Sequence, residues 1–280
     1  MTHNLVDAIE NLSAPQTRAF NYLMHHPLLT ADQLTVCLRL KYRRSLTGSN
    51  GVLAHLNRTG LITTTKWRAP NEDRSKTRLF VPIGVFAAVH GHSPLTDKYR
   101  AWFRRLRTQI SACGPETSSL VPLLQLNEWF SELLKQVIRR VDFAACWHAP
   151  PLNCLNAPAL DASLLDVLTC GKSSRWLVAY VDGSASARAF VRGMWHWSSI
   201  TYARLSGVVA LAEDLDAGRI LAAEIAQAGP SGLAQQLIHA RWSDVKDSPL
   251  DASYLSSWRN DRRHGPLDAL TALNPGCLLY

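Results

Sequence analysis

The stretch from Thr30 to Arg78 reads TADQLTVCLRL (30–40), KYRRSLTGSNGVLAHLNRTG (41–60), LITTTKW (61–67), RAPNEDRSK (68–76) and TR (77–78). Its first half has apolar residues at helical spacing. Its second half has a run rich in β-branched residues, as strands have, followed by a polar, basic turn and the start of a second strand. This order of helices, strand, basic turn and strand decides how the rest of the chain is interpreted.

Capping signals delimit the first two helices. One helix is expected over residues 13–26, with Ser13 as its N-cap and Pro15 in its first turn. The next helix begins at Thr30, which can form a capping box with Gln33. Both starts are predicted from residues close together in the sequence.

A third helix is expected within residues 45–59, starting near Ser49 or Asn50 and ending at Gly60, the residue type that often follows a helix. Its outer face and approach carry side chains of the kinds that contact phosphates and base edges. These candidate DNA-binding residues are Lys41, Arg43, Arg44, Ser45, Thr47, Ser49, Asn50, His55 and Arg58.

Two strands are expected next, at residues 61–67 and 77–81, joined by a turn at 68–76. The hairpin adds the candidate DNA-binding residues Lys66, Arg68, Arg74 and Lys76. Three helices followed by a basic hairpin predict a winged helix-turn-helix domain over residues 1–92. Such a domain places one helix in the major groove of double-stranded DNA.

Positive charge is concentrated in the same part of the chain. Residues 1–112 hold 16 Lys and Arg against 6 Asp and Glu, a net charge of +10, and residues 113–280 hold 14 against 16, a net charge of −2. A basic surface attracts phosphates whatever their base sequence, and salt weakens that attraction. The asymmetry favours a polyanionic partner over a generic basic surface.

Composition sets the broad class of the protein. With 280 residues, 47% hydrophobic and 19% charged, the chain has room for two globular domains. No apolar run reaches the roughly 18 residues of a membrane helix, and the N-terminus lacks a secretory signal. Six scattered cysteines without a CxxC pair predict reduced thiols in the cytoplasm. The sequence therefore predicts a cytoplasmic protein with no metal, cofactor or membrane partner.

The second half predicts a separate α/β domain. Residues 93–119 are expected to be a basic connector helix and linker; its segment 98–109 either lies along DNA or has one solvated face. A long helix is expected at 120–140. The later elements are expected as strands at 141–148, 159–168 and 174–183, a helix at 186–204, a strand at 207–213, a helix near 215–228 and a strand at 236–245. This order predicts a mixed central sheet over residues 120–245 and a peripheral tail over 246–280.

Several segments resemble the replication-relaxation family of plasmid and mobile-element proteins, across residues 17–258. They are VPIGVFAAVHG (81–91), LLQLNEWFSELLKQV (123–137), LDAS (160–163), WLVAYVDGSAS (176–186), GVVALAED (207–214) and ARWSDV (240–245). That family's C-terminal half looks related to the PD-(D/E)xK nuclease core. The resemblance therefore implies a winged helix followed by a nuclease-like α/β domain.

The nuclease motif is altered in this chain. The PD-(D/E)xK core uses an Asp, then an acidic residue and a Lys two positions further on, to hold a divalent metal and activate water. Asp161 matches the first position. Tyr180 stands at the acidic position, and Asp182 stands at the lysine position. The resemblance thus implies a degenerate nuclease core.

Two interpretations of this region remain open. In one, the two aspartates converge on a metal and Arg188 or Arg192 replaces the lysine. In the other, Asp182 belongs to a turn at the end of a strand, and Ser184 or Ser186 caps the helix that follows.

The favoured hypothesis is a sequence-specific double-stranded DNA-binding protein of a plasmid, phage or other mobile element. It would act in transcription regulation or in plasmid replication and maintenance. A homodimer is expected, because DNA-binding proteins of this kind commonly bind two-fold sites. The alternatives are a metal-dependent DNA nickase or nuclease and a DNA-tethered scaffold that binds a partner protein through its C-terminal domain.

Overall fold

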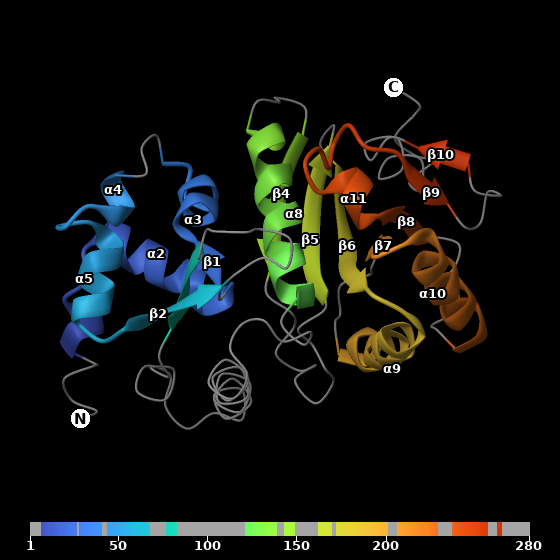
Figure 1. Cartoon of the computed structure of the whole chain (residues 1–280), viewed down its shortest axis with the longest axis horizontal. Helices are drawn as coiled ribbons and strands as arrows, with labels where there is room; N and C mark the ends of the chain where they lie inside the picture. Colours follow the sequence, from blue (N-terminus) through green and yellow to red (C-terminus); the bar gives the residue numbers. More distant parts are fainter. Residues whose placement is uncertain are drawn as a thin grey trace. The chain divides into compact units, whose positions relative to one another are not determined.

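A computed structural model of the chain describes residues 7–26, 28–40, 44–67, 77–82, 121–138, 143–148, 162–169, 172–200, 206–228, 237–256 and 262–264. The chain divides into two compact units, Met1–Asn127 and Glu128–Tyr280. The described residues combine helices with β-sheet in both units, so the protein belongs to the mixed α/β class (Figure 1). Among the described residues, no helix combines the length and the apolar character that crossing a membrane requires.

The first unit pairs short helices with a small antiparallel sheet. Its elements are α2 (Ala14–His25), β1 (Leu29–Thr30), α3 (Ala31–Cys37), α4 (Arg44–Thr47), α5 (Val52–Arg58), β2 (Ile62–Trp67) and β3 (Thr77–Pro82). The strand order is β1-β3-β2, and Phe80 of β3 pairs with Leu29 on one side and with Thr64 on the other. The two-residue β1 is an addition to the predicted elements.

Local capping signals place the first two helices as predicted. The backbone N–H of Ser13 donates to Gln16 Oε1 at 2.8 Å, just before α2. The N–H of Thr30 donates to Gln33 Oε1 at 2.9 Å, and Thr30 Oγ1 accepts from the N–H of Gln33 at 3.1 Å. These contacts satisfy N–H groups that the first turn of a helix leaves without partners.

The third helix expected within residues 45–59 is present as α5, which begins at Val52 rather than near Ser49 or Asn50, and α4 is an additional short helix before it. Between α4 and α5 the chain turns, and the N–H of Gly51 donates to the carbonyl of Gly48 at 2.7 Å. A Cβ atom at Gly51 would lie 2.5 Å from the carbonyl oxygen of Leu46. Only glycine permits this approach, so α5 starts after Ser49 and Asn50 rather than at them.

The second unit is built on one seven-stranded sheet. Helix α8 (Val121–Val137) belongs to this unit from Glu128 onward. The other elements are β4 (Phe143–His148), β5 (Ala162–Thr169), β6 (Lys172–Val181), α9 (Ser184–Ile200), β7 (Gly207–Ala212), α10 (Leu215–Ala228), β8 (Leu237–Arg241), α11 (Trp242–Val245), β9 (Tyr254–Ser256) and β10 (Arg262–His264). The strand order is β10-β9-β8-β7-β6-β5-β4. Strands β6, β7 and β8 are parallel and the other pairings are antiparallel. The predicted mixed sheet is confirmed.

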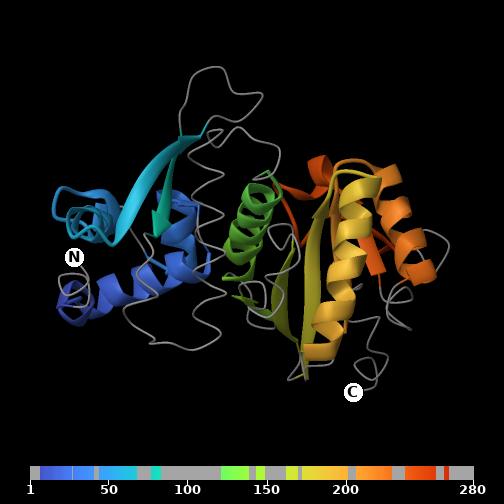
Figure 2. The same ribbon diagram turned by 90° about the horizontal axis from the view of Figure 1, so that it is seen from below.

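Helices α9 and α10 cover the same face of this sheet (Figure 2). One buried apolar cluster joins Leu177 of β6 and Val208 of β7 to Phe190 of α9 and Leu221 of α10. The six residues of β7 are all buried. Strands covered on both faces read as continuous apolar runs, which explains the sequence GVVALA.

The end of the chain contributes more to the sheet than a peripheral tail would. The strand predicted over 236–245 ends at Arg241, and α11 follows it. Within the stretch predicted as a tail, β9 pairs with β8, and the side chain of Tyr254 is buried. The indole Nε1 of Trp129 in α8 donates to the Tyr254 hydroxyl at 3.2 Å. Burial of this aromatic ring outweighs the polar composition around it.

Candidate functional site

The structure places the predicted DNA-binding residues of the first unit around α4 and α5. Side chains that are exposed there are Ser45, Thr47, Ser49, Asn50 and Arg58, and His55 is partly exposed. Leu53 and Leu56 face the core from α5. Arg58 lies on the opposite side of that helix, because it is five residues after Leu53 and two after Leu56. Hydroxyl, amide and guanidinium groups are donors that suit phosphate oxygens and base edges.

The other predicted DNA-binding residues are described in part or not at all. Arg44 begins α4, and Lys66 lies in β2 at the position that pairs with Arg78 of β3. The remaining residues fall outside the described residues: Lys41, Arg43, Arg68, Arg74 and Lys76. The last three of these belong to the connection between β2 and β3.

The altered acidic motif lies where the parallel strands β6 and β7 end. The Tyr180 hydroxyl donates a hydrogen bond to the Glu213 carboxylate, which directly follows β7. Its ring meets Trp242 of α11 edge-on, with centroids 5.9 Å apart. Burial, the bond to Glu213 and the charges of Glu213 and Asp182 all raise the pKa of Tyr180. The residue that the resemblance aligns with the acidic position of the nuclease motif is therefore a hydroxyl donor held by Glu213.

Asp182 belongs to the turn that leads into α9. The Ser186 hydroxyl accepts from the N–H groups of Asp182 and Gly183 at 3.1 and 3.2 Å, and it donates to the Gly183 carbonyl at 2.9 Å. Gly183 also accepts from the N–H of Ala187 at 3.0 Å, as an N-cap residue does. Gly183 is therefore the N-cap residue of α9, and the hydroxyl that satisfies the N–H groups before the helix comes from Ser186 rather than Ser184, which agrees with the capping interpretation.

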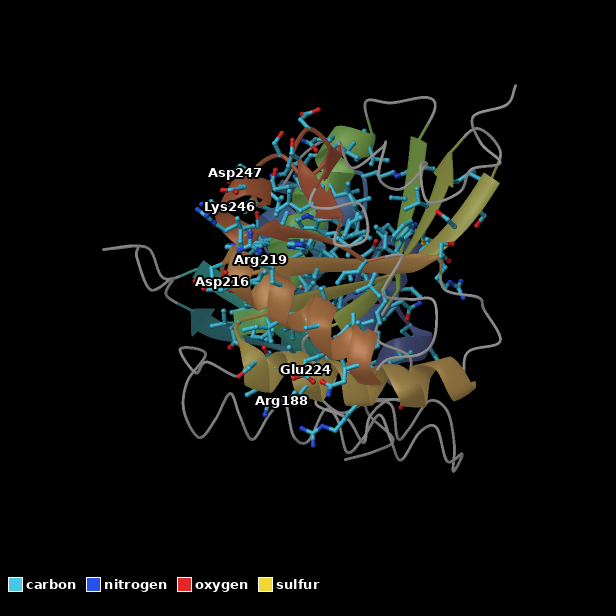
Figure 3. The ribbon with its side chains drawn as sticks, turned by 90° about the vertical axis from the view of Figure 1, so that its right-hand side faces the viewer. Arg188, Asp216, Arg219, Glu224, Lys246 and Asp247 are labelled. Carbon is cyan, nitrogen blue, oxygen red and sulfur yellow. The ribbon has the colours of Figure 1, made fainter. Side chains whose placement is uncertain are left out.

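Arg188 is directed to the neighbouring helix. Its Nε lies 3.1 Å from Glu224 Oε1 of α10, and Figure 3 shows the two side chains turned toward each other. Arg192 Nε donates to the Arg188 carbonyl at 3.3 Å. The structure therefore gives both arginines contacts on the helical surface. Asp161, the third residue of the enzyme hypothesis, lies outside the described residues.

The part played by Glu213 was not evident from the sequence. The register of β6 and β7 pairs Val181 with Ala212, so the residues that follow these strands meet at one edge. The usable signal was that the predicted strands 174–183 and 207–213 both carry an acidic residue at their C-terminal end, Asp182 and Glu213. At this edge Glu213 accepts from Tyr180, and Asp214 Oδ1 caps α10 by accepting from the N–H of Ala217 at 2.7 Å. Among the described residues, no three His, Cys, Asp or Glu side chains are grouped to hold a metal ion.

The sheet topology also bears on this edge. In open α/β sheets, ligands bind in the crevice where the strand order reverses and helices lie on opposite faces. Here the order runs through β6, β7 and β8 without reversal, and α9 and α10 share one face. The edge formed by these parallel strands therefore lacks the arrangement that opens such a crevice.

Comparisons of the chain with protein-family models, curated proteins and solved structures gave no match.

Proposed function

We propose that this chain is a sequence-specific double-stranded DNA-binding protein of a plasmid, phage or other mobile element. In this proposal its first unit is a winged helix-turn-helix domain. The observation that carries it is the order α2-β1-α3-α4-α5-β2-β3 together with the sheet order β1-β3-β2. Helix α5 would enter the major groove, and the β2–β3 hairpin would be the wing.

The exposed side chains of the first unit support this assignment. Arg58 lies on the outer side of α5, and Ser45, Thr47 and Asn50 are exposed on the approach to it. The net charge of +10 over residues 1–112 supplies attraction to phosphates along the whole duplex. Phosphate contacts fix the register, and contacts to base edges select the sequence.

The second unit has a non-catalytic part in this proposal. Tyr180 and Glu213 hold one another, and Ser186 caps α9 through the Asp182 turn. Residues held by these contacts stabilise the edge of the sheet. In this proposal the second unit therefore acts in the assembly of the protein on DNA. The role in the cell would be transcription regulation or plasmid replication and maintenance.

Replacing Arg58 by alanine is expected to weaken binding to all duplexes alike, by about 3- to 10-fold. The slope of log affinity against log salt should fall by about 1, because one phosphate contact is lost. Fluorescence anisotropy with a labelled random duplex at several salt concentrations measures both effects. The matched control is Arg219→Ala, which removes an equal charge from a side chain that is 59% exposed on α10. An equal loss in the control, or none in the Arg58 variant, contradicts the proposed interface.

Incubation of the protein and supercoiled plasmid with Mg²⁺ or Mn²⁺ is expected to leave the plasmid uncut. The reason is the residue chemistry at the sheet edge, where Tyr180 replaces the metal-binding carboxylate. Agarose gel electrophoresis separates nicked from supercoiled DNA and gives the result directly. Metal-dependent nicking that Asp182→Ala abolishes would establish the nuclease instead, whereas nicking that persists in this variant comes from another source.

A further inference from the structure

The two edges of the seven-stranded sheet differ in length and charge. One edge is β10, whose three residues, Arg262 to His264, are all basic types. The other is β4, six residues long, with the sequence FAACWH and no Pro, Lys, Arg, Asp or Glu. An edge strand presents unpaired N–H and C=O groups, and proteins protect such edges by shortness, charge, proline or bulges. Strand β10 has two of these protections, and β4 has none in its sequence.

The backbone of β4 is also regular. It pairs with β5 at every position, from Phe143 opposite Thr169 to His148 opposite Leu164, so no bulge interrupts the ladder. In the described part of the sheet, β5 is the strand that pairs with β4, and the other side of β4 forms the edge. A straight, uncharged edge of six residues is long enough to receive another strand.

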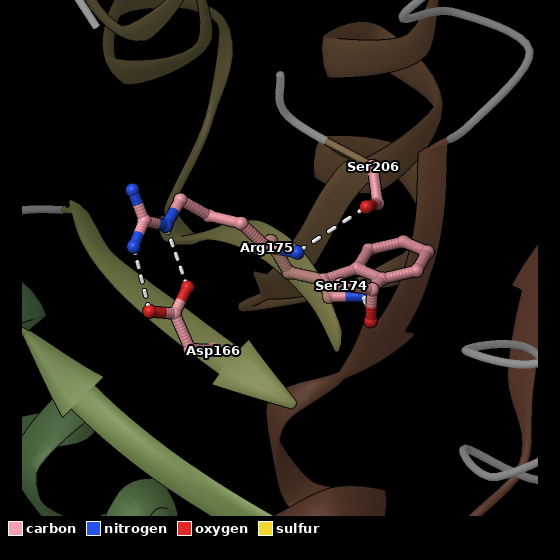
Figure 4. A network of polar contacts seen from close by, with 5 residues as sticks. Asp166, Ser174, Arg175 and Ser206 are labelled. Atoms are coloured by element: carbon pink, nitrogen blue, oxygen red, sulfur yellow. Dashed lines mark hydrogen bonds and ion pairs between the residues drawn. The ribbon is translucent and has the colours of Figure 1, made fainter. Parts of the chain in front are cut away.

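The surface beside this edge is exposed and electrically balanced. Ala144 and Cys146 of β4 are exposed, and the Leu168 side chain opposite Ala144 is 47% exposed. In the next row, the Arg175 guanidinium binds the Asp166 carboxylate through two contacts of 2.5 and 2.7 Å (Figure 4). These two charges neutralise each other within one copy, so this pair adds no net charge beside the edge.

We propose that β4 pairs antiparallel with β4 of a second copy of this chain, about a two-fold axis perpendicular to the sheet. Such an axis sets each face of one sheet beside the same face of the other, and both copies contribute the same residues to the interface. Strand β4 can pair with its own copy without repulsion, because no like charges face each other across the axis. Self-pairing of β10 would set arginines against arginines, which is destabilising.

The small side chains in the middle of β4 fit this pairing. Ala144, Ala145 and Cys146 lie between the larger Phe143 and Trp147 in the sequence, so the strand centre leaves room near the axis. The resulting continuous sheet would carry two N-terminal units for two half-sites. The purpose of the dimer therefore rests on the proposed DNA-binding function, while the strand pairing itself does not.

The test compares Ala144→Lys with Ser173→Lys in the full chain. Ser173 is exposed and lies in the same row as Ala144, two strands further in, about 10 Å away at the usual strand spacing. Sedimentation velocity should show a wild-type dimer, a monomeric Ala144→Lys variant and a dimeric Ser173→Lys variant, and far-UV circular dichroism should show that all three are folded. A wild-type monomer, or an Ala144→Lys variant that stays dimeric, overturns the proposal. The proposal is also overturned if the wild type binds a different protein through β4, which would show as binding that the Ala144→Lys variant loses.

Cross-linking of the protein without the lysine substitution provides a second measurement if the Ala144→Lys variant fails to fold. In either symmetric register about residue 145 or 146, the two Cys146 side chains lie within about 8 Å of each other. With Cys113, Cys154, Cys170 and Cys277 replaced by serine, a short bismaleimide should therefore yield a covalent dimer, and the further change Cys146→Ser should abolish it. Cys37 should not react readily, because burial raises its pKa to about 12. The absence of a Cys146-dependent dimer contradicts the pairing.

DNA-binding measurements distinguish the strand pairing from the proposed DNA-binding function. The Ala144→Lys variant should still bind a duplex with a single half-site as the wild type does, and lose only the added affinity for two half-sites. A wild-type dimer that fails to bind duplex DNA would refute the proposed function and leave the strand pairing intact.

Discussion

Replacement of Arg43, Arg44 and Arg74 together by alanine is expected to reduce the affinity of the chain for duplex DNA about 100-fold or more. The first two residues lie before and at the start of α4, and the third lies in the connection between β2 and β3. Each arginine contact with DNA is worth about 1–3 kcal/mol, and 1.4 kcal/mol corresponds to about a tenfold change. Because charge is lost at three positions, the salt slope should also fall by about 2 to 3. Mobility-shift titrations over a range of salt concentrations measure both quantities.

The matched control removes the same charge from the second unit. Arg188, Arg192 and Arg219 are exposed on α9 and α10, and they are replaced together by alanine. The control breaks the contacts of Arg188 with Glu224 and of Arg219 with Asp216, but surface ion pairs contribute little to stability. Affinity should stay within about threefold of the wild type. Equal losses in both triple variants would indicate a diffuse charge effect, and unchanged affinity in the first would refute the proposed interface.

Gly218→Ala is expected to destabilise the second unit by about 2–3 kcal/mol, in the range for overpacking a core. A Cβ atom at this position of α10 would lie 2.5 Å from Nδ1 of His239 and 3.0 Å from its Cγ. The imidazole is fully buried and belongs to β8, which is paired on both sides, so it has little freedom to move away. Relief requires α10 to shift from the sheet and to loosen the cluster around Leu221. Thermal and urea unfolding measure the loss, and the midpoint should fall by about 5–10 °C.

Gly183→Ala is the control for this substitution. A Cβ atom there meets no atom within 4 Å, and the residue is likewise a glycine at the beginning of a helix. Its cost should stay below about 1 kcal/mol, the range for a change of an N-cap residue. If the two alanine variants are equally stable, the contact between Gly218 and His239 does not limit the packing of α10.

Signals within a few residues of each other predicted most element positions. The bonds between Thr30 and Gln33 belong to one helical turn, so the sequence contains everything needed to place the start of α3. The break between α4 and α5 depends on the approach of Gly51 to the Leu46 carbonyl, which only the folded chain brings about. Strand β1 is two residues long and exists because β3 pairs with it. Such elements follow from tertiary pairing rather than from local preference.

The candidate sites show the same difference between features that local sequence determines and features that tertiary pairing determines. That Tyr180 and Asp182 depart from a nuclease motif was readable in the sequence. The partner of Tyr180 comes from another strand through the register of β6 and β7, and Arg188 finds Glu224 on a different helix. No spacing rule within one element predicts such pairs. The roles of Asp161, Arg68, Arg74 and Lys76 stay predictions, because these residues lie outside the described residues.

The order of strands in the second unit has a consequence for how the protein is made. Each strand lies beside its neighbour in the sequence, so no strand has to insert between two that are already paired. Contacts between sequence neighbours cost less loop-closure entropy and form sooner than distant ones. The sheet can therefore grow in the order of synthesis, from β4 to β10. The growing end is finished by the short basic strand, and among the described strands β5 alone pairs with β4. On the proposed pairing, two chains emerging from neighbouring ribosomes can meet through β4 before either has been completed.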